Sequence, residues 1–214
     1  MHKTLIIVPM KKLSDAKSRL NRSISNRLRI KVARKLLNQT LSRLSTAIKG
    51  NEETHKLMVL TECAEVRSFV TKKNIPVITS SIKDKLSESL FFGVNWAKNN
   101  GFSSACIIPA DLADPSPREL REFLLFPIEE NNMVICPATD LGTNALFISP
   151  PDAVTFCYGK KSFNKHLEIA NRNKIKTTVL ALKSLTFDID RMEDLKELLV
   201  KKPYFLSTGN ICDG

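Results

Sequence analysis

The chain alternates between short apolar runs and longer segments in which apolar positions recur every three or four residues. Short apolar runs predict buried strands, and the three-to-four spacing predicts amphipathic helices. In the first half the expected strands are residues 5–8, 57–61, 75–79 and 105–109, and the expected helices are residues 23–49, 64–73 and 86–99. Strands that alternate with helices in this way predict a mostly parallel sheet with right-handed crossovers.

The second half of the chain has a less regular pattern. Expected strands cover residues 133–137, 145–148 and 175–182, and expected helices cover residues 117–126, 159–173 (with a leading loop) and 193–200. Because no linker, repeat or low-complexity tract divides the chain, we interpret residues 1–214 as one domain.

A basic loop, residues 9–20, follows the first expected strand. Its charged residues are Lys11, Lys12, Asp15, Lys17 and Arg19. In parallel α/β sheets ligands bind beyond the carboxyl ends of the strands, so this loop, Thr61 and Asp111 are expected along one rim. Lys supplies a point charge and Arg a fork of donors, which suits an anionic ligand; a solvated basic loop is the alternative. The chain has no G-x-G-x-x-G or Walker sequence, so neither a dinucleotide site nor a P-loop is indicated.

The charge of the chain is concentrated near its start. The net charge is +11 over 214 residues, and residues 11–35 hold ten Lys or Arg, Arg22 among them, against one acid. Nucleic acid, an acidic membrane surface or small polyphosphorylated substrates would each explain this charge. The segment has no Phe, Tyr or Trp to stack on bases, which favours small phosphorylated ligands. We interpret most of the charge on the helix expected at residues 23–49 as its solvent-facing surface.

The cysteines and the apolar runs indicate a cytoplasmic protein. The five cysteines are scattered and form no C-x-x-C pair, which favours a reducing compartment over a disulfide frame or a zinc site. They are Cys63, Cys106, Cys136, Cys157 and Cys212. We expect no signal peptide, because the first apolar run leads into a basic loop and not into a small-residue cleavage site. No apolar run approaches the roughly 20 residues that span a membrane.

Three aspartates are the strongest candidates for chemistry. Asp111 ends a strongly apolar strand, where an unpaired carboxylate would be costly. Asp188 and Asp190 alternate on an extended segment, so their side chains are expected on one side, with Ile189 opposed. Three carboxylates on one rim beside the basic loop would hold a hard cation such as Mg²⁺ for phosphoryl or nucleotidyl transfer. The alternative is that Asp188 or Asp190 only caps the helix that begins near Glu193.

The other reactive side chains do not predict a nucleophile site. His166 lies in a helical stretch, and we interpret it as a surface or packing residue. Ser162 and Cys157 lack a histidine and an acid in a plausible position, so no catalytic triad is predicted.

Four segments of the chain together carry the pattern of a known family. They are residues 8–20 (VPMKKLSDAKSRL), 142–147 (GTNALF), 158–166 (YGKKSFNKH) and 188–195 (DIDRMEDL). In this order, and spread over most of the chain, they resemble the 2-phospho-L-lactate guanylyltransferase family, which includes phosphoenolpyruvate and 3-phospho-D-glycerate guanylyltransferases.

The resemblance implies an α/β nucleotidyltransferase-A-like (nucleotide-diphospho-sugar transferase) fold, with three α/β/α layers and a mostly parallel mixed sheet. It implies a Mg²⁺-dependent transferase that joins GMP from GTP to 2-phospho-L-lactate, phosphoenolpyruvate or 3-phospho-D-glycerate. The reaction would release pyrophosphate and serve coenzyme F-420 biosynthesis. GTP and the phosphorylated three-carbon acid are the expected partners, with no nucleic acid and no membrane, and a homodimer is the candidate assembly.

The resemblance also implies roles for individual residues. The implied metal ligands are Asp111, Asp188 and Asp190. The triphosphate would be held by Lys11, Lys17 and Arg19, and the implied catalytic residues are Lys17 and Asp111. The carboxylate of the acid would be received, through hydroxyl and backbone N–H donors, by Thr143, Gly159 and Ser162.

The chain departs from the family pattern at a few positions. Ala113 and Met192 stand where the family usually has proline, and Lys85 and Ser87 stand where it tends to Gly-Leu-Asn, so the nucleotide preference stays open. One alternative is a related enzyme that transfers CMP or UMP, or GMP to a sugar phosphate or molybdopterin. Such enzymes carry a Gly-rich opening loop, and here no glycine precedes residue 50. Another alternative is a basic nucleic-acid-binding protein that uses residues 11–35.

Overall fold

The computed structural model describes residues 2–20, 23–79 and 85–207, so Arg22 and Cys212 lie outside the described residues. The described strands are β1 (Thr4–Pro9), β2 (His55–Leu60), β3 (Val77–Ile78), β4 (Ser104–Ile107), β5 (Asn132–Pro137), β6 (Thr143–Ser149) and β7 (Lys176–Val179). The described helices are α1 (Asn26–Ala47), α2 (Ala64–Thr71), α3 (Leu86–Asn99), α4 (Pro117–Leu124), α5 (Ser162–Arg172) and α6 (Met192–Lys201), with a 3-10 turn at Ser18–Leu20. Within these ranges, no helix is long and apolar enough to cross a membrane.

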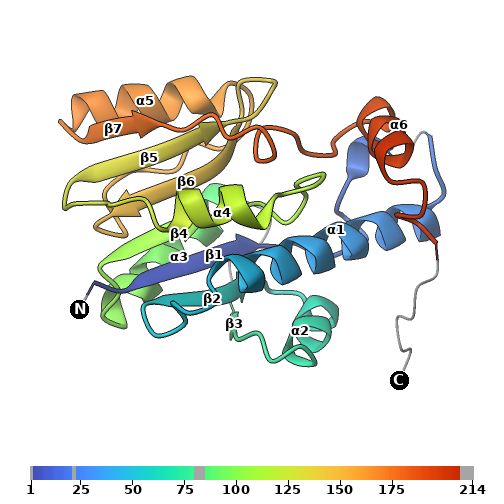
Figure 1. Cartoon of the computed structure of the whole chain (residues 1–214), viewed down its shortest axis with the longest axis horizontal. Helices are drawn as coiled ribbons and strands as arrows, with labels where there is room; N and C mark the ends of the chain where they lie inside the picture. Colours follow the sequence, from blue (N-terminus) through green and yellow to red (C-terminus); the bar gives the residue numbers. More distant parts are fainter. Residues whose placement is uncertain (1, 21–22, 80–84, 208–214) are drawn as a thin grey trace.

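The seven described strands form one sheet in the order β3-β2-β1-β4-β6-β5-β7 (Figure 1). Strands β1 to β4 pair in parallel with one another, and β7 pairs in parallel with β5. Strand β6 pairs antiparallel with both of its neighbours, β4 and β5. The prediction of a mostly parallel, mixed sheet is confirmed.

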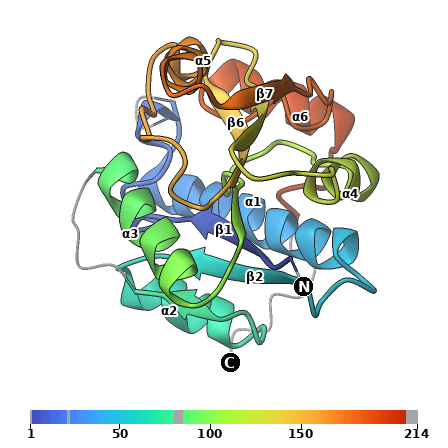
Figure 2. The ribbon, with the colours of Figure 1, turned by 90° about the vertical axis from the view of Figure 1, so that its left-hand side faces the viewer.

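Helices cover both faces of the sheet, which gives the predicted three layers. Along β1, Ile6 and Val8 pack in one apolar cluster with α1, α2 and α4, whereas Leu5 and Ile7 pack in a second cluster with α3 and α5. This alternation follows from the two-residue period of a strand that is buried on both faces. Figure 1 shows α1 and α4 in front of the sheet and α3 behind it, and Figure 2 turns these layers side by side.

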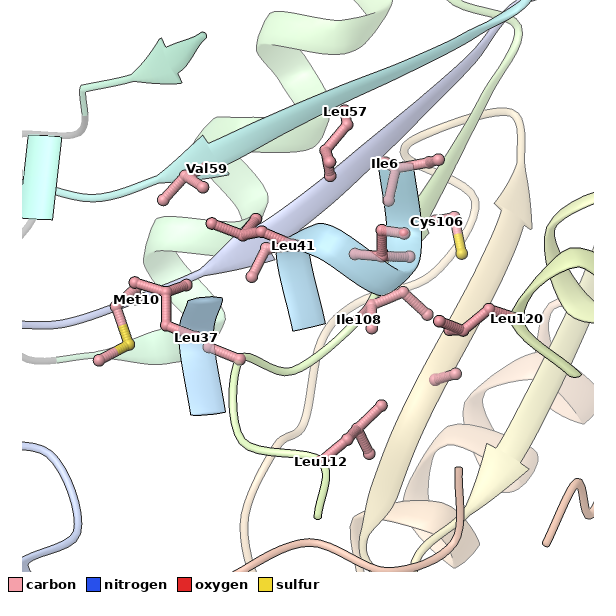
Figure 3. Close-up of a cluster of buried hydrophobic side chains, with 14 of the residues drawn as sticks. Ile6, Met10, Leu37, Leu41, Leu57, Val59, Cys106, Ile108, Leu112 and Leu120 are labelled. Carbon is pink, nitrogen blue, oxygen red and sulfur yellow. The ribbon is translucent and has the colours of Figure 1, made fainter. Parts of the chain in front are cut away.

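The face under α1 contains the larger core. Figure 3 shows Leu37 and Leu41 of α1 among Ile6, Val59 and Cys106 of the sheet. These side chains are almost completely buried. Removing one of them, as in Leu41→Ala, therefore costs about 2–5 kcal/mol, the sum of lost burial and the cavity left behind.

Helix α1 differs from the prediction in one respect that affects the basic loop. It begins after Ser25, whose hydroxyl accepts a hydrogen bond from the backbone N–H of Leu28 (3.3 Å). Among its charged residues Arg27 is exposed, whereas Arg29 is only 5% exposed; the half-buried ones are Lys31, Arg34, Lys35 and Arg43. The guanidinium of Arg29 donates to the backbone carbonyl of Ala16 and to the side chain of Asn26. Arg29 is therefore an exception to the interpretation that most of this helix's charge faces solvent, and it ties the basic loop to α1.

Helix α6 packs against the first half of α1 (Figure 1). Leu195 and Leu198 of α6 join Val32 and Leu36 of α1 in a third apolar cluster. Ile189, which precedes α6, is completely buried in the same cluster. This packing holds the Asp188–Asp190 segment against the carboxyl edge of the sheet.

Candidate active site

A cavity of about 600 Å³ opens at the carboxyl ends of β1, β2 and β4. Strand β6 runs the opposite way, so its first residues reach the same edge. All nine residues that the sequence implied for the site line this cavity: Lys11, Lys17, Arg19, Asp111, Thr143, Gly159, Ser162, Asp188 and Asp190. The expected rim residue Thr61 lines it too.

A short backbone pairing brings the three aspartates together. Leu112 and Asp188 form an isolated antiparallel bridge. On either side of it, the N–H of Ile189 donates to the carbonyl of Asp111 (3.1 Å), and the N–H of Ala113 donates to the carbonyl of Phe187 (3.0 Å). With Ile189 buried on one side, the carboxylates of Asp188 and Asp190 turn to the cavity, as the alternation predicted.

The capping alternative for Asp188 and Asp190 is wrong. The carboxylate at the start of α6 belongs to Asp194, which accepts from the backbone N–H groups of Asp190 (2.9 Å) and Arg191 (2.6 Å). Asp194 is therefore the acidic member of a capping box, in which it accepts from the N–H of the N-cap residue Arg191. The other two carboxylates are left for the cavity.

The aspartate cluster fits a divalent cation. One oxygen each of Asp111, Asp188 and Asp190 lies within 4.8 Å of the others. Burial and the neighbouring charges of Asp111 and Asp190 raise the pKa of Asp188 to about 6. Carboxylates held this close repel one another, so a positive charge among them is favourable. An all-oxygen set of this kind suits Mg²⁺.

Lys17 and Arg19 lie against the same carboxylates. The Lys17 ammonium is hydrogen-bonded to Asp111 and lies 3.6 Å from Asp190 Oδ1, and Arg19 forms an ion pair with Asp190. The Lys17 side chain is 4% exposed, whereas that of Arg19 is 61% exposed. Burial alone would lower the pKa of Lys17, but the carboxylates outweigh it and raise the pKa above its ordinary value. Lys17 is therefore a permanent, buried cation at the cluster.

The backbone at Lys17 is unusual. Its φ of 56° lies in the left-handed region, which costs a non-glycine residue roughly 1 kcal/mol or more. The Arg29 hydrogen bond to the neighbouring Ala16 carbonyl holds the loop in this shape. Lys11, by contrast, is exposed on the rim of the cavity.

Thr143, Gly159 and Ser162 also come together, as predicted. Thr143 begins β6 and Ser162 begins α5, and the Ser162 hydroxyl donates to Thr143 Oγ1 (3.2 Å). The N–H of Ser162 donates to the carbonyl of Gly159 (3.1 Å), whose φ of 118° suits glycine alone. The positive end of the α5 dipole lies at this point, which favours an anion.

Three further residues contribute to the site and were not predicted to do so. Asn144 is buried, and its amide donates to Asp188 Oδ1 (3.3 Å). Strand alternation assigns Thr143 and Asn144 to opposite faces, but at the open end of β6 both line the cavity. Tyr158 lines the cavity as well, and its ring contacts His166. His166 is completely buried, so it is a packing residue and not a surface one. Its position four residues after Ser162 places both side chains on one face of α5, and this spacing could have indicated from the sequence that His166 lies beside the site.

The fold and this site define a nucleotidyltransferase. The chain resembles a putative nucleotide-diphospho-sugar transferase from Desulfovibrio desulfuricans G20 (TM-score 0.70, 14% identity, covering 97% of this chain and 90% of the other). It also resembles a nucleotidyl transferase from Methanothermobacter (TM-score 0.66, 14% identity, covering 98% and 100%). At such identities the likeness establishes the fold, and the predicted nucleotidyltransferase-A-like fold is confirmed.

Within this class, the chain belongs to the CofC-like guanylyl transferase family, whose sequence model matches residues 4–203. It is 32% identical to the 3-phospho-D-glycerate guanylyltransferase of Colwellia psychrerythraea, over 98% of each chain. It is 29% identical to the phosphoenolpyruvate guanylyltransferase of Sphaerobacter thermophilus, over 94% of each chain. A 2-phospho-L-lactate guanylyltransferase from Methanocaldococcus infernus is 28% identical, over 91% of this chain and 83% of the relative. The predicted family is confirmed.

Proposed function

We propose that this protein joins GMP from GTP to a phosphorylated three-carbon acid and releases pyrophosphate, a step of coenzyme F-420 biosynthesis. The observation that carries the proposal is the content of one cavity: three clustered carboxylates, a basic loop and a hydroxyl pair at a helix N-terminus. The first two suit a nucleoside triphosphate with its metal, and the third suits a second, smaller anion.

Mg²⁺ would be held by Asp111, Asp188 and Asp190. When bound, it neutralises charge that develops on the phosphates. Asn144 would hold the Asp188 carboxylate in position through its amide hydrogen bond. The neighbouring Lys17 is charged at neutral pH, because the same carboxylates raise its pKa.

The chemistry needs no nucleophile from the protein. A phosphate oxygen of the acid is already anionic at neutral pH, and it would attack the α-phosphorus of GTP. The new bond is phosphate oxygen to α-phosphorus, and the bond that breaks joins the α-phosphorus to the bridging oxygen of the leaving pyrophosphate. Lys11, Lys17 and Arg19 would hold the triphosphate and stabilise this leaving group, so the protein contributes position and charge.

The acid would bind by its carboxylate at Thr143, Gly159 and Ser162. The nucleoside would extend toward the part of the cavity lined by Thr61, Lys85, Leu86 and Ser89, beyond the basic loop. Among the three candidate acids, 3-phospho-D-glycerate is the first to test, because the relative named for it is 32% identical over 98% of each chain.

A pyrophosphate-release assay tests the proposal. We expect release from GTP and Mg²⁺ only when 3-phospho-D-glycerate, phosphoenolpyruvate or 2-phospho-L-lactate is present, with a guanylylated acid as the second product by mass spectrometry. Asp111→Asn should lower the rate by roughly 10³-fold or more while leaving the circular dichroism spectrum unchanged, since one of the three carboxylates that would hold Mg²⁺ is lost. The proposal would be refuted if pyrophosphate were released with CTP or UTP but not with GTP, or if none of the three acids supported its release from GTP.

A further inference from the structure

A buried histidine lies directly behind the Thr143–Ser162 pair. His166 is four residues after Ser162 on α5, so both side chains face β6. His166 Nδ1 is 3.0 Å from Thr143 Oγ1, and His166 Nε2 is 3.1 Å from the backbone nitrogen of Cys157. The ring of Tyr158 packs edge-on against the imidazole, with 5.2 Å between ring centroids. Both ring nitrogens of His166 are therefore engaged.

These contacts determine where the imidazole carries its hydrogen. A backbone N–H can only donate, so Nε2 of His166 must accept from Cys157 and cannot be protonated. The hydrogen of the neutral ring is then on Nδ1, which donates to Thr143 Oγ1. Burial, with a smaller contribution from Lys165, lowers the pKa of His166 to about 4, so the ring stays neutral at physiological pH.

The direction of this hydrogen bond decides what the hydroxyl pair can offer to the cavity. Thr143 and Ser162 have one hydroxyl hydrogen each, and the bond between them uses one. Because His166 donates to Thr143, the second hydrogen remains unused within the network. If the histidine instead accepted from Thr143, both hydrogens would be consumed and the pair could only accept.

We propose that His166 is a positioning residue that keeps one hydroxyl hydrogen of the Thr143–Ser162 pair available to the carboxylate of the acceptor acid. The identity of the anion rests on the proposed function; the direction of the hydrogen bonds does not. In the arrangement of the structure Ser162 donates to Thr143, so the free hydrogen is that of Thr143, at the first position of β6 and within the cavity lining.

Two substitutions of His166 separate the roles of its two nitrogens. His166→Asn keeps an amide N–H near the position of Nδ1, and so keeps a donor for Thr143. His166→Gln keeps an amide oxygen near the position of Nε2, and so satisfies Cys157 without a donor for Thr143. We expect His166→Gln to raise KM for the acid about tenfold or more, the effect of one hydrogen bond to a charged group, with KM for GTP unchanged. The His166→Asn variant, which keeps a donor for Thr143, should have a KM for the acid within about twofold of wild type.

A double-mutant comparison tests whether His166 acts through the threonine hydroxyl. Thr143→Val removes this hydroxyl with little change in shape and should itself raise KM for the acid. Adding His166→Gln to Thr143→Val should raise KM no further. Additive effects, an equal rise in KM for GTP, or equal defects in the Asn and Gln variants would show that His166 is merely structural and would overturn the proposal.

A measurement without turnover makes the two proposals separable. In ¹⁵N-labelled wild-type protein at pH 7, we expect the proton of His166 on Nδ1 and an unprotonated Nε2, observed through the ring ¹⁵N chemical shifts. A proton on Nε2 would overturn the inference whatever the enzyme does. If instead Nδ1 carries the proton but no acid supports pyrophosphate release, the proposed function fails while the hydrogen-bond direction stands.

Discussion

The buried imidazole of His166 predicts a specific loss of stability in acid. Its pKa is about 4 in the folded protein against an ordinary value of 6.5, because burial disfavours the charged ring. Between these two values the unfolded chain binds a proton that the folded chain does not. The neutral His166 therefore makes its full contribution to the free energy of unfolding above about pH 6.5, and this contribution is lost as the pH falls toward 4.

The size of the effect follows from the two pKa values. Linkage gives a loss of about 2.5 kcal/mol of unfolding free energy between pH 7.5 and pH 4.5 from this residue alone. Urea unfolding of the wild type and of His166→Asn at both pH values measures it. At pH 7.5 the wild type should be the more stable protein, and the difference should shrink by about 2.5 kcal/mol at pH 4.5, since asparagine does not titrate.

The comparison between the two proteins isolates His166 from the other groups that titrate in acid. Burial also lowers the pKa of His55, which adds a slope of the same sign. That slope, like those of the carboxylates, is present in both proteins and cancels in the difference. Parallel stability curves for the wild type and His166→Asn, or an imidazole that titrates near pH 6.5 by NMR, would refute the reasoning.

Three further predictions concern the charged groups. Asp188→Asn should lower turnover by roughly 10³-fold. Its Tm, measured in EDTA at pH 8, should be unchanged or higher, because burial and the neighbouring carboxylates raise the pKa of Asp188 to about 6 and so disfavour its charged form at pH 8. A lower Tm would contradict this reasoning. Lys17→Met should reduce kcat by about 10²-fold or more, measured by pyrophosphate release, whereas the exposed Lys56→Ala on β2 should match the wild type. Arg29→Met should lower the unfolding free energy by about 1–3 kcal/mol in urea titrations, since the buried Ala16 carbonyl loses its donor, and an unchanged midpoint would contradict that role.

The sequence predicted the helices better than the ends of the sheet. Helix α3 begins and ends where its apolar spacing indicated, at residues 86 and 99. The edge strands β3 and β7 are shorter than predicted, with two and four residues against five and eight. A strand's length at an edge depends on the one neighbour it pairs with, and local composition does not contain that information. The antiparallel direction of β6 depends in the same way on contacts that are distant in sequence.

The sequence predicted site residues that stand out among their immediate neighbours, and it did not predict roles that depend on contacts distant in sequence. Asp111 was found because a carboxylate that ends an apolar strand needs a partner, and Asp188 because of its alternation with Asp190. The burial of Lys17 depends on Asp111, 94 residues away, and could not be predicted from the loop itself. His166 was interpreted as a surface or packing residue; its burial excludes the surface position, and its hydrogen bonds to Thr143 and Cys157 follow only from the packing of α5 on β6.

The basic segment shows why net charge is a weak guide to anion binding. Residues 11–35 contain ten cations, but the described ones differ in what they can do. Two guanidinium nitrogens of Arg29 donate to the Ala16 carbonyl and to the Asn26 side-chain oxygen, so its charge holds the loop, and Arg29 is not among the residues that line the cavity. Lys17 is buried against carboxylates, whereas Arg19 and Lys11 keep exposed surface at the cavity. In the proposed function the triphosphate is therefore held by the few cations that line the cavity, and the overall excess of charge mainly sets the surface potential.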